Sequence, residues 1–190
     1  MNIVDQTQQN DVVNALLAFK RRIVSDPSGV LAGWNSSTNS NPCNWRGVSC
    51  SHGPTSRVEK LNLAAANLTG TLDGKLGQLK YLIDLNLSSN TFSGPIPSQI
   101  GKLRNLTVLD LSRNQLHGNL PLELLTSLQK LAVMRLDDNM LNGSIPSQLG
   151  ELREFLHLNL SANWLYGKIP MELGQLLNLE VLDLSQNRLA

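Results

Sequence analysis

Histidines, cysteines and one glycine-containing segment are the residues of this 190-residue sequence that could support chemistry. His52, His117 and His157 are scattered along the chain, and none belongs to a Cys–His or Ser–His–Asp arrangement that could activate a nucleophile. The segment GTLDGKL, Gly70 to Leu76, resembles a phosphate-binding loop only superficially. Its glycines are one residue too close together, and Leu76 stands where Ser or Thr is required. The sequence therefore predicts neither an enzyme nor a bound cofactor.

The two cysteines, Cys43 and Cys50, allow either a disulfide or part of a metal site. Two thiols alone make an incomplete zinc site, and no histidine lies at zinc-finger spacing. Their short separation and the loop beside them favour a disulfide, worth about 2–3 kcal/mol on chain-entropy grounds. We therefore expect a disulfide, an oxidising compartment and no metal ion.

The composition excludes several classes of function. The net charge of +1 gives no long-range field that would attract nucleic acid or a charged membrane. No apolar run approaches the roughly 20 residues that span a bilayer. The first ten residues, MNIVDQTQQN, lack the charged and apolar regions of a signal peptide. Leucine supplies 38 residues whereas aromatics make up 4%, which indicates a core built from one repeated side chain.

One ten-residue pattern returns along the chain. It reads LNLAAANLTG from Leu61, LNLSSNTFSG from Leu85, LDLSRNQLHG from Leu109, MRLDDNMLNG from Met134, LNLSANWLYG from Leu158 and LDLSQNRLA from Leu182. The period is 24 residues, with one 25-residue interval whose extra residue lies in PLELLTSLQKL. The spelling matches the leucine-rich-repeat template. Because one such unit cannot bury its own apolar face, we expect the units to stack into a solenoid.

Each column of the repeat has its own physical requirement. In LDL, Leu109 and Leu111 should face the core while Asp110 faces outward, and neighbouring units should pair as a parallel sheet about 4.8 Å apart. An inward amide column should bond backbone groups of adjacent turns, with Ala66 ending the ladder; its members are Asn90, Asn114, Asn139, Asn163 and Asn187. A small-residue column allows the chain to bend; its members are Gly70, Gly94, Gly118, Gly143 and Gly167. A proline column follows, with Pro97, Pro121, Pro146 and Pro170, before short helical segments (LGQL, IGKL, LGEL) on the convex side.

Residues 1–57 do not repeat, and we expect them to cap the first leucine layer. Asn10–Asp11 could start a helix that runs to about Ser25 and ends at DPSG. Its apolar residues fall on or near one face; they are Val13, Leu16, Leu17, Phe19, Ile23 and Val24. Trp34 and Trp45 could cover the exposed end of the leucine core.

The cap and the repeats together resemble the ectodomains of plant leucine-rich-repeat receptor-like kinases. The cap letters are ALLAFKRRIVSDPSGVLAGWN and CNWRGVSC, and the repeat letters are FSGPIPSQIGKLRNLTVLDLSRN and LNGSIPSQLGELREFLHLNLSAN. The resemblance implies an α/β solenoid: a right-handed superhelix with a parallel concave sheet, a second set of short strands and a helical N-terminal cap. We expect a cap over residues 1–57 and about six repeats over 58–190, the last incomplete.

The resemblance also implies an extracellular signalling or defence role. The partner would be a peptide or protein ligand, or another leucine-rich-repeat ectodomain, recognised on the concave or lateral face of the solenoid. Because the chain stops mid-repeat, we expect a fragment whose membrane attachment and kinase lie in a missing C-terminal segment. Two alternatives remain: a secreted inhibitor similar to polygalacturonase-inhibiting proteins, and a truncated scaffold without activity of its own.

Six Asn-x-Ser/Thr sequons support an extracellular, cell-surface setting. They begin at Asn35, Asn67, Asn86, Asn105, Asn142 and Asn159. The alternative is that repeat spelling produces them, since Asn is common before Leu and Ser after it. Glycans on Asn86 or Asn159 would block the concave face, whereas Asn35 and Asn105 are easier to accept.

The outward-facing residues of units three to five differ from the residue types common at these positions, and they are our candidate ligand-binding residues on the concave face. The set is Asp110, Arg113, Val133, Arg135, Asp137, Asp138, His157 and Asn159. The alternative is a neutral surface ladder, since Asp110 and Arg135 are neighbours on adjacent strands and an exposed ion pair contributes only about 0–1 kcal/mol. His117 and Trp164 are interpreted as surface residues beside the asparagine column.

Overall fold

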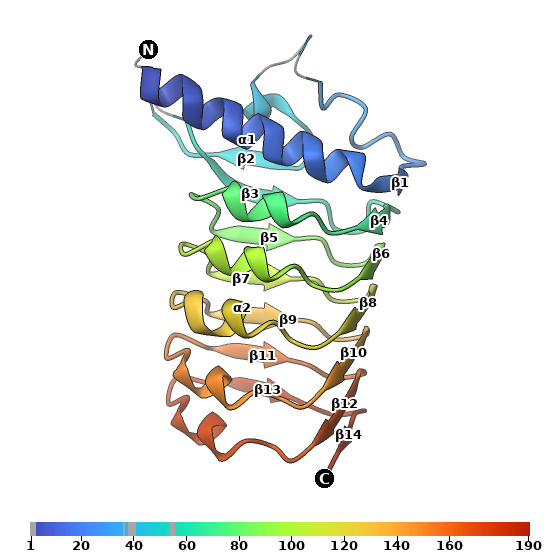
Figure 1. Ribbon diagram of the computed structural model, residues 1–190, viewed down its shortest axis with the longest axis vertical. Coiled ribbons are helices and arrows are strands. Elements are labelled where there is room, and N and C mark those ends of the chain that lie inside the picture. The colour runs from blue at the N-terminus through green and yellow to red at the C-terminus, as the bar shows by residue number, and fades with distance from the viewer. Residues whose placement is uncertain (1–2, 36, 38–40, 54–55) are drawn as a thin grey trace.

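The computed structural model describes residues 3–35, 37, 41–53 and 56–190, and it forms a stack of coils closed at one end by a helix (Figure 1). The helices are α1 (Ile3–Arg21), α2 (Leu122–Ser127) and the 3₁₀ helices η1 (Pro42–Asn44), η2 (Gly74–Gln78), η3 (Ser98–Lys102), η4 (Ser147–Glu151) and η5 (Met171–Gln175). The prolines at 97, 121, 146 and 170 directly precede η3, α2, η4 and η5. The expected short convex helices are therefore confirmed.

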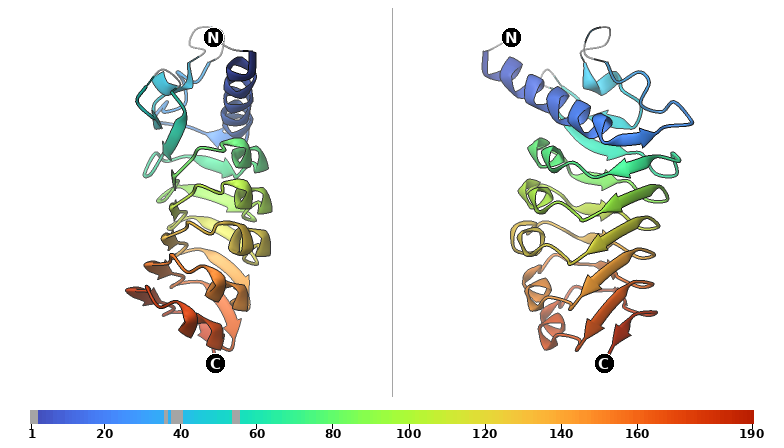
Figure 2. Two further views of the ribbon diagram at one scale, coloured as in Figure 1. Left: turned by 90° about the vertical axis from the view of Figure 1, so that its left-hand side faces the viewer. Right: turned by 45° about the vertical axis from the view of Figure 1, so that its right-hand side comes forward.

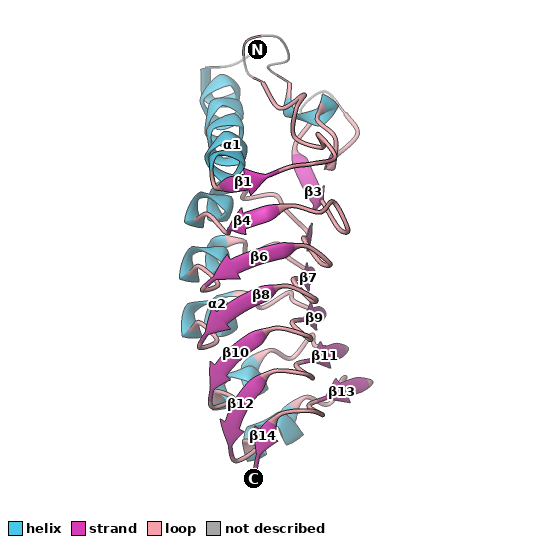
Figure 3. Cartoon of the chain, turned by 90° about the vertical axis from the view of Figure 1, so that its right-hand side faces the viewer, coloured by secondary structure: helices cyan, strands magenta, loops and turns pink. Residues whose placement is uncertain are grey.

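The strands form two seven-stranded sheets along the stack. The concave sheet runs in the order β13 (Val181–Asp183), β11 (His157–Asn159), β9 (Val133–Arg135), β7 (Val108–Asp110), β5 (Asp84–Asn86), β3 (Val58–Asn62) and β2 (Val48–Cys50). The second sheet, here called the lateral sheet (Figure 3), runs β1 (Ile23–Ser25), β4 (Thr69–Thr71), β6 (Thr91–Gly94), β8 (Gln115–Gly118), β10 (Met140–Gly143), β12 (Trp164–Gly167) and β14 (Arg188–Leu189). Repeat strands pair in parallel. Strands β1 and β2 of the N-terminal segment pair antiparallel at the ends of the two sheets.

The N-terminal helix differs from the prediction at both of its ends. It begins at Ile3 rather than near Asn10, and it ends at Arg21 rather than near Ser25. The next residues form β1 because they reach the open edge of the lateral sheet, where Ile23 lies opposite Gly70. A Cβ atom at residue 70 would collide with the carbonyl oxygen of Arg22, so this glycine allows the close approach. Val24, expected near the core, is 84% exposed.

The N-terminal segment covers the end of the stack of repeats (Figure 2), and its aromatic side chains are buried there, as predicted. Trp34 and Trp45 are buried and stack with ring centroids 5.4 Å apart. Phe19 of α1 lies 6.3 Å from Trp34 and 5.8 Å from Phe92 of β6, centroid to centroid. The cap and the repeats therefore share one continuous hydrophobic core.

The asparagine ladder is confirmed, and Asn114 shows its geometry. Its Nδ2 donates to the carbonyl oxygens of Leu87 in the preceding coil and Leu111 in its own coil, both at 3.1 Å. Its Oδ1 accepts from the N–H of Phe92 at 2.9 Å. The same pattern holds at Asn90, Asn139, Asn163 and Asn187. The coil that contains Ala66 has its backbone groups bonded by Asn90, so the ladder begins there.

The glycine column and the extra residue also have clear structural roles. Gly94, Gly118, Gly143 and Gly167 adopt φ values between +83° and +88°, which favour glycine. The 25-residue interval contains α2, an α-helical segment, where the other repeats have 3₁₀ helices. The insertion is therefore absorbed on the convex side, and the strand register of the concave sheet is preserved.

Candidate ligand-binding face

In most coils, the last side chain of the concave strand accepts a hydrogen bond from the backbone N–H two residues later, an arrangement that we call the bracket. Coils one to six are the repeats whose ten-residue patterns begin at Leu61, Leu85, Leu109, Met134, Leu158 and Leu182. In coil three, Oδ1 of Asp110 accepts from the N–H of Ser112 at 3.1 Å and from its hydroxyl at 2.7 Å. The corresponding asparagine or aspartate of four other coils accepts from the backbone two residues later; these residues are Asn62, Asn86, Asn159 and Asp183. The common Asn/Asp–x–Ser spelling is thus structural, as expected for side chains that cap local backbone groups.

Coil four breaks this bracket. Arg135 replaces the accepting residue, and Asp137 replaces the serine. One carboxylate oxygen of Asp137, Oδ1, is buried and has no hydrogen-bond partner among the described residues. Burial raises the pKa of Asp137, and the carboxylates of Asp110 and Asp138 act in the same direction. The coil thus carries a charge that the repeat scaffold does not require.

Asp110 corrects one expectation about this face. It belongs to β7 as predicted, but it is only 7% exposed. Its Oδ2 lies 3.8 Å from Nη1 of Arg135 on the adjacent strand, and its other oxygen is bonded by Ser112. The expected neutral ladder is therefore present at this point. Asp110 is positioned to support Arg135, whose side chain is 48% exposed, rather than to meet a ligand directly.

The other predicted residues form one continuous region across β7, β9 and β11. Val133 lies opposite both Val108 and His157 in strand register. Arg113 and Asp138 are exposed and have φ values of +54° and +55°. The same φ recurs at the equivalent position of other coils, such as Ser89 and Gln186. This backbone conformation is therefore a property of the repeat rather than strain stored at a binding site.

Two acidic residues adjoin this region, and neither was included in the candidate site predicted from the sequence. Glu180 Oε2 lies 3.4 Å from Nε2 of His157. Burial raises the pKa of Asp84, with Lys60 opposing the shift and Asp110 adding to it. Asp84 is the first residue of β5, so strand alternation alone indicates that it faces outward. Glu180 directly precedes β13, so only a comparison of the residues before each strand would indicate that it lies near His157.

Comparison with known proteins agrees with the cap and the repeats. A leucine-rich-repeat N-terminal domain matches residues 9–51, and leucine-rich repeats match residues 56–116 and 105–128. Protein MALE DISCOVERER 1 of Arabidopsis thaliana is 45% identical over 67 residues, which cover 35% of this chain and 9% of that relative. The chain therefore spans only about a tenth of the length of such curated relatives.

Solved structures extend the likeness to the whole solenoid. In the BIR3–SERK2 complex from Arabidopsis thaliana, the matching chain is 37% identical with a TM-score of 0.82, and the match covers 95% of each chain. The chain belongs to the plant leucine-rich-repeat receptor ectodomains. The Arabidopsis HAESA ectodomain, solved with an IDA peptide hormone ligand, is 34% identical with a TM-score of 0.85 over 97% of this chain and 30% of that one.

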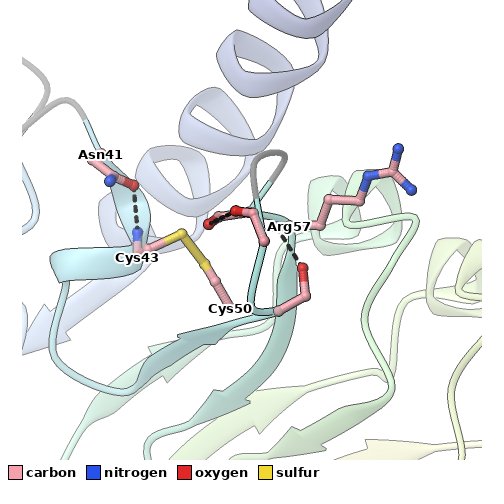
Figure 4. Close-up of a disulfide and its surroundings, with 7 residues drawn as sticks. Asn41, Cys43, Cys50 and Arg57 are labelled. Atoms are coloured by element: carbon pink, nitrogen blue, oxygen red, sulfur yellow. Dashed lines mark hydrogen bonds between the residues drawn. A yellow bond between two sulfur atoms is a disulfide. The ribbon is translucent and has the colours of Figure 1, made fainter.

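The cap of this receptor ectodomain contains the predicted disulfide between Cys43 and Cys50, with Cα atoms 5.6 Å apart (Figure 4). Oδ1 of Asn41 accepts from the N–H of Cys43 at 3.0 Å and starts η1. Ser51 and Arg57 hold the other side of the loop, with the N–H of Ser51 donating to the Arg57 carbonyl at 2.9 Å. The disulfide thus ties η1 to β2 beside the first repeat.

The sequons of the ectodomain differ in their surroundings. Asn35, Asn67 and Asn142 are exposed, although Ser36 of the first sequon lies outside the described residues. Asn86 and Asn159 use Oδ1 in the bracket described above. Asn105, expected to accept a glycan easily, is half-buried; its Nδ2 donates to the Lys80 carbonyl at 3.0 Å, and its Oδ1 accepts from Lys130 at 2.9 Å. We therefore expect Asn35 and Asn67, which lie outside the strands, to be better acceptors than the bonded asparagines, whereas Asn142 lies within β10 of the lateral sheet.

The concave sheet of the ectodomain presents an extended surface with exposed charged side chains, among them Arg113, Arg135 and Asp138. Within residues 3–35, 37, 41–53 and 56–190, no group of three His, Cys, Asp or Glu side chains could hold a metal ion. None of the described helices is both long and apolar enough to cross a bilayer. A concave sheet with exposed charges is suited to binding an extended partner.

Proposed function

We propose that this chain is an extracellular recognition module of a plant receptor-like kinase. Its concave face over β7, β9 and β11 binds a peptide or protein ligand, or another receptor ectodomain. The observation that carries the proposal is that coil four lacks the bracket. Arg135 and Asp137 replace the Asn/Asp and Ser that form it in other coils, and the buried Oδ1 of Asp137 has no hydrogen-bond partner among the described residues. Departures from the scaffold rule of this kind are typical of functional positions.

The neighbours support this class of partner. The HAESA ectodomain was solved with a peptide hormone ligand, and BIR3 with SERK2. Six repeat strands at about 4.8 Å spacing extend about 24 Å, which suits a short extended peptide or part of a larger interface. Val133 is an apolar residue that lies opposite His157 in strand register and two residues before Arg135 on β9. A peptide segment with charges of both signs and one apolar side chain would therefore fit this face.

The proposal can be tested with a library of short displayed peptides selected on the wild-type ectodomain. We expect the Arg135→Gln/Asp137→Ser variant to bind the selected peptides at least about tenfold more weakly. The matched control is Arg153→Gln/Glu154→Ser, which removes one cation and one anion from exposed residues outside both sheets. Equal binding by both variants would show that coil four is not the recognition site.

The membrane attachment and kinase of the proposed receptor are tested separately. We expect the transcript to continue beyond the codon for Ala190 through further repeats into a membrane helix and a kinase. A stop codon soon after that position would identify a free binding module and overturn the receptor proposal.

A further inference from the structure

The lateral sheet runs along the whole stack (Figure 3), and the side chains on its outer face differ between its early and late strands. Its early strands carry small hydroxyl side chains, Thr69 and Thr71 on β4 and Thr91 and Ser93 on β6. The later strands carry Met140 on β10, Trp164 and Tyr166 on β12, and Arg188 on β14. Because the early coils fold with threonine and serine at these positions, the scaffold does not require the large side chains.

Trp164 and Tyr166 form an exposed aromatic pair. They flank Leu165, which is fully buried, so alternation along β12 places both rings on the outer face. Trp164 is 49% exposed and Tyr166 is 57% exposed. The guanidinium of Arg188, on the neighbouring strand, lies 5.9 Å from the Trp164 ring centroid. Trp, Tyr, Arg and Met are the residues enriched at the energetic centres of protein interfaces.

The charge of this surface is of one sign. None of the seven lateral strands contains Asp or Glu. Lys168, which directly follows β12, and Arg188 add two positive charges, and neither joins an ion pair among the described residues. The concave strands, in contrast, contain charges of both signs: the carboxylates Glu59, Asp84, Asp110 and Asp183 and the cations Lys60 and Arg135. An acidic partner would therefore find positive charge without neighbouring strand carboxylates on the lateral sheet, whereas carboxylates lie beside the cations of the concave sheet.

We propose that the C-terminal half of the lateral sheet is a second binding surface, which takes an acidic peptide segment of a partner protein. This surface, the aromatic–cationic face, consists of Met140, Trp164, Tyr166, Lys168 and Arg188. The aromatic pair receives apolar side chains of the segment, and Lys168 and Arg188 pair with its carboxylates. The surface is separate from coil four of the concave sheet, so it goes beyond the function proposed above.

The surroundings of Trp164 favour a peptide over a neutral sugar chain. Arg188 already lies beside the Trp164 ring, whereas a sugar would need that ring free for stacking, and a neutral sugar would leave both cations unpaired. Asn142, the exposed sequon residue of β10, is in register with Trp164. A glycan on Asn142 would cover the aromatic–cationic face, so the proposal requires this sequon to remain unmodified in the secreted protein.

Tryptophan fluorescence gives a direct readout, because Trp164 is exposed whereas Trp34 and Trp45 are 1% and 2% exposed. The probes are two blocked peptides of about 12 residues, long enough to cross three strands. One contains Glu, Leu and Gly, and the other replaces every Glu with Lys. We expect the Glu peptide to shift the Trp164 emission to the blue, to bind at least about tenfold more tightly than the Lys peptide, and to weaken with added salt.

Matched variants separate the proposed contacts from general charge. We expect Lys168→Glu/Arg188→Glu to weaken binding of the Glu peptide at least about tenfold, and Tyr166→Ser, which copies Ser93 of coil two, to weaken it severalfold. The control Lys102→Glu/Arg153→Glu makes the same charge change at exposed residues outside both sheets and should bind as the wild type does. Circular dichroism verifies that each variant is folded.

Four results would overturn the proposal. These are equal affinity for the Glu and Lys peptides, no change in Trp164 emission, and undiminished binding by the Lys168→Glu/Arg188→Glu variant. The fourth is full glycan occupancy of Asn142 in the secreted protein. A neutral cello-oligosaccharide that shifts the emission more strongly than the Glu peptide would identify a sugar-binding platform instead.

Discussion

The side-chain amide of Asn139 donates a hydrogen bond to the carbonyl oxygen of Leu111 in the preceding coil, with an N–O distance of 3.0 Å. The same side chain accepts from the N–H of Leu116 at 3.0 Å and donates to the carbonyl of Leu136 at 3.1 Å. Asn139 is 7% exposed, so water cannot readily replace it. The backbone of each coil is therefore completed by a side chain of the next coil, which couples the stability of neighbouring repeats.

Replacing Asn139 by alanine should leave these backbone groups buried without partners. We expect Asn139→Ala to lower the free energy of unfolding by about 3 kcal/mol, measured by urea denaturation. The matched control is Asn178→Ala, which removes an exposed amide that donates to the Arg153 carbonyl at 3.0 Å; we expect a change within about 0.5 kcal/mol. Equal losses in the two variants would contradict the dependence on burial.

The convex helices supply a second matched pair, Gly101 and Gly174. A Cβ atom at residue 101 would lie 2.5 Å from the carbonyl oxygen of Glu123 in the next coil, whereas one at residue 174 would meet nothing within 4 Å. Neither glycine has a positive φ. We expect Gly101→Ala to cost about 1–3 kcal/mol through overpacking and Gly174→Ala to be neutral or slightly stabilising. Thermal unfolding of both variants checks this, and a comparable loss at residue 174 would show that backbone conformation rather than coil spacing sets the requirement.

The repeat elements could be predicted from the sequence because each repeated residue type meets a local structural requirement that recurs in every coil. Leu109 and Leu111 alternate with Asp110, and Asn114 serves the backbone next to it. The cap was harder, because its pairing partners lie far away in the chain. Helical spacing alone could not show that Ile23 pairs with Gly70, 47 residues later, and that this sheet edge ends the helix at Arg21.

The candidate binding face was predictable in outline, but the accessibility of its members was not. Columns of letters identified Arg135 and Asp137 as departures from the repeat. They could not show that Asp110 is covered by Ser112 and Arg135. Burial on this face depends on side chains of adjacent coils, so it follows from the stacked structure and not from any single repeat.

The Cys43–Cys50 disulfide should stabilise the cap more than the repeats. Replacing both cysteines by alanine reopens a short loop, and we expect a cost of about 2 kcal/mol. Hydrogen exchange should quicken in η1, β2 and β3, while β9 and β11 keep their protection. Reduction of the wild-type protein is the control and should give the same pattern. Uniformly faster exchange along the solenoid would show that the cap limits the stability of every coil.

Asp137 should make the stability of the ectodomain depend on pH. Burial raises the pKa of its carboxyl above the ordinary value of 3.8; its own backbone N–H and Arg113 oppose the shift, and Asp110 and Asp138 add to it. Because the folded protein holds this proton more tightly than the unfolded chain does, ionisation penalises the folded state, and the penalty grows as the pH rises from 3.8 through the folded-state pKa.

Asp137→Asn removes the ionisable group, so we expect this variant to be more stable than the wild type near pH 7 and to lose that advantage near pH 3. Urea midpoints at both values provide the measurement, and the exposed neighbour Asp138→Asn is the control for simple loss of one negative charge. An advantage of equal size at both pH values would arise from hydrogen bonding by the new amide and would contradict a burial penalty on the carboxylate. A lower stability near pH 7 would show that the ionised form is favoured through Arg113, and coil four would then be a structural ion pair rather than a site held ready for a ligand.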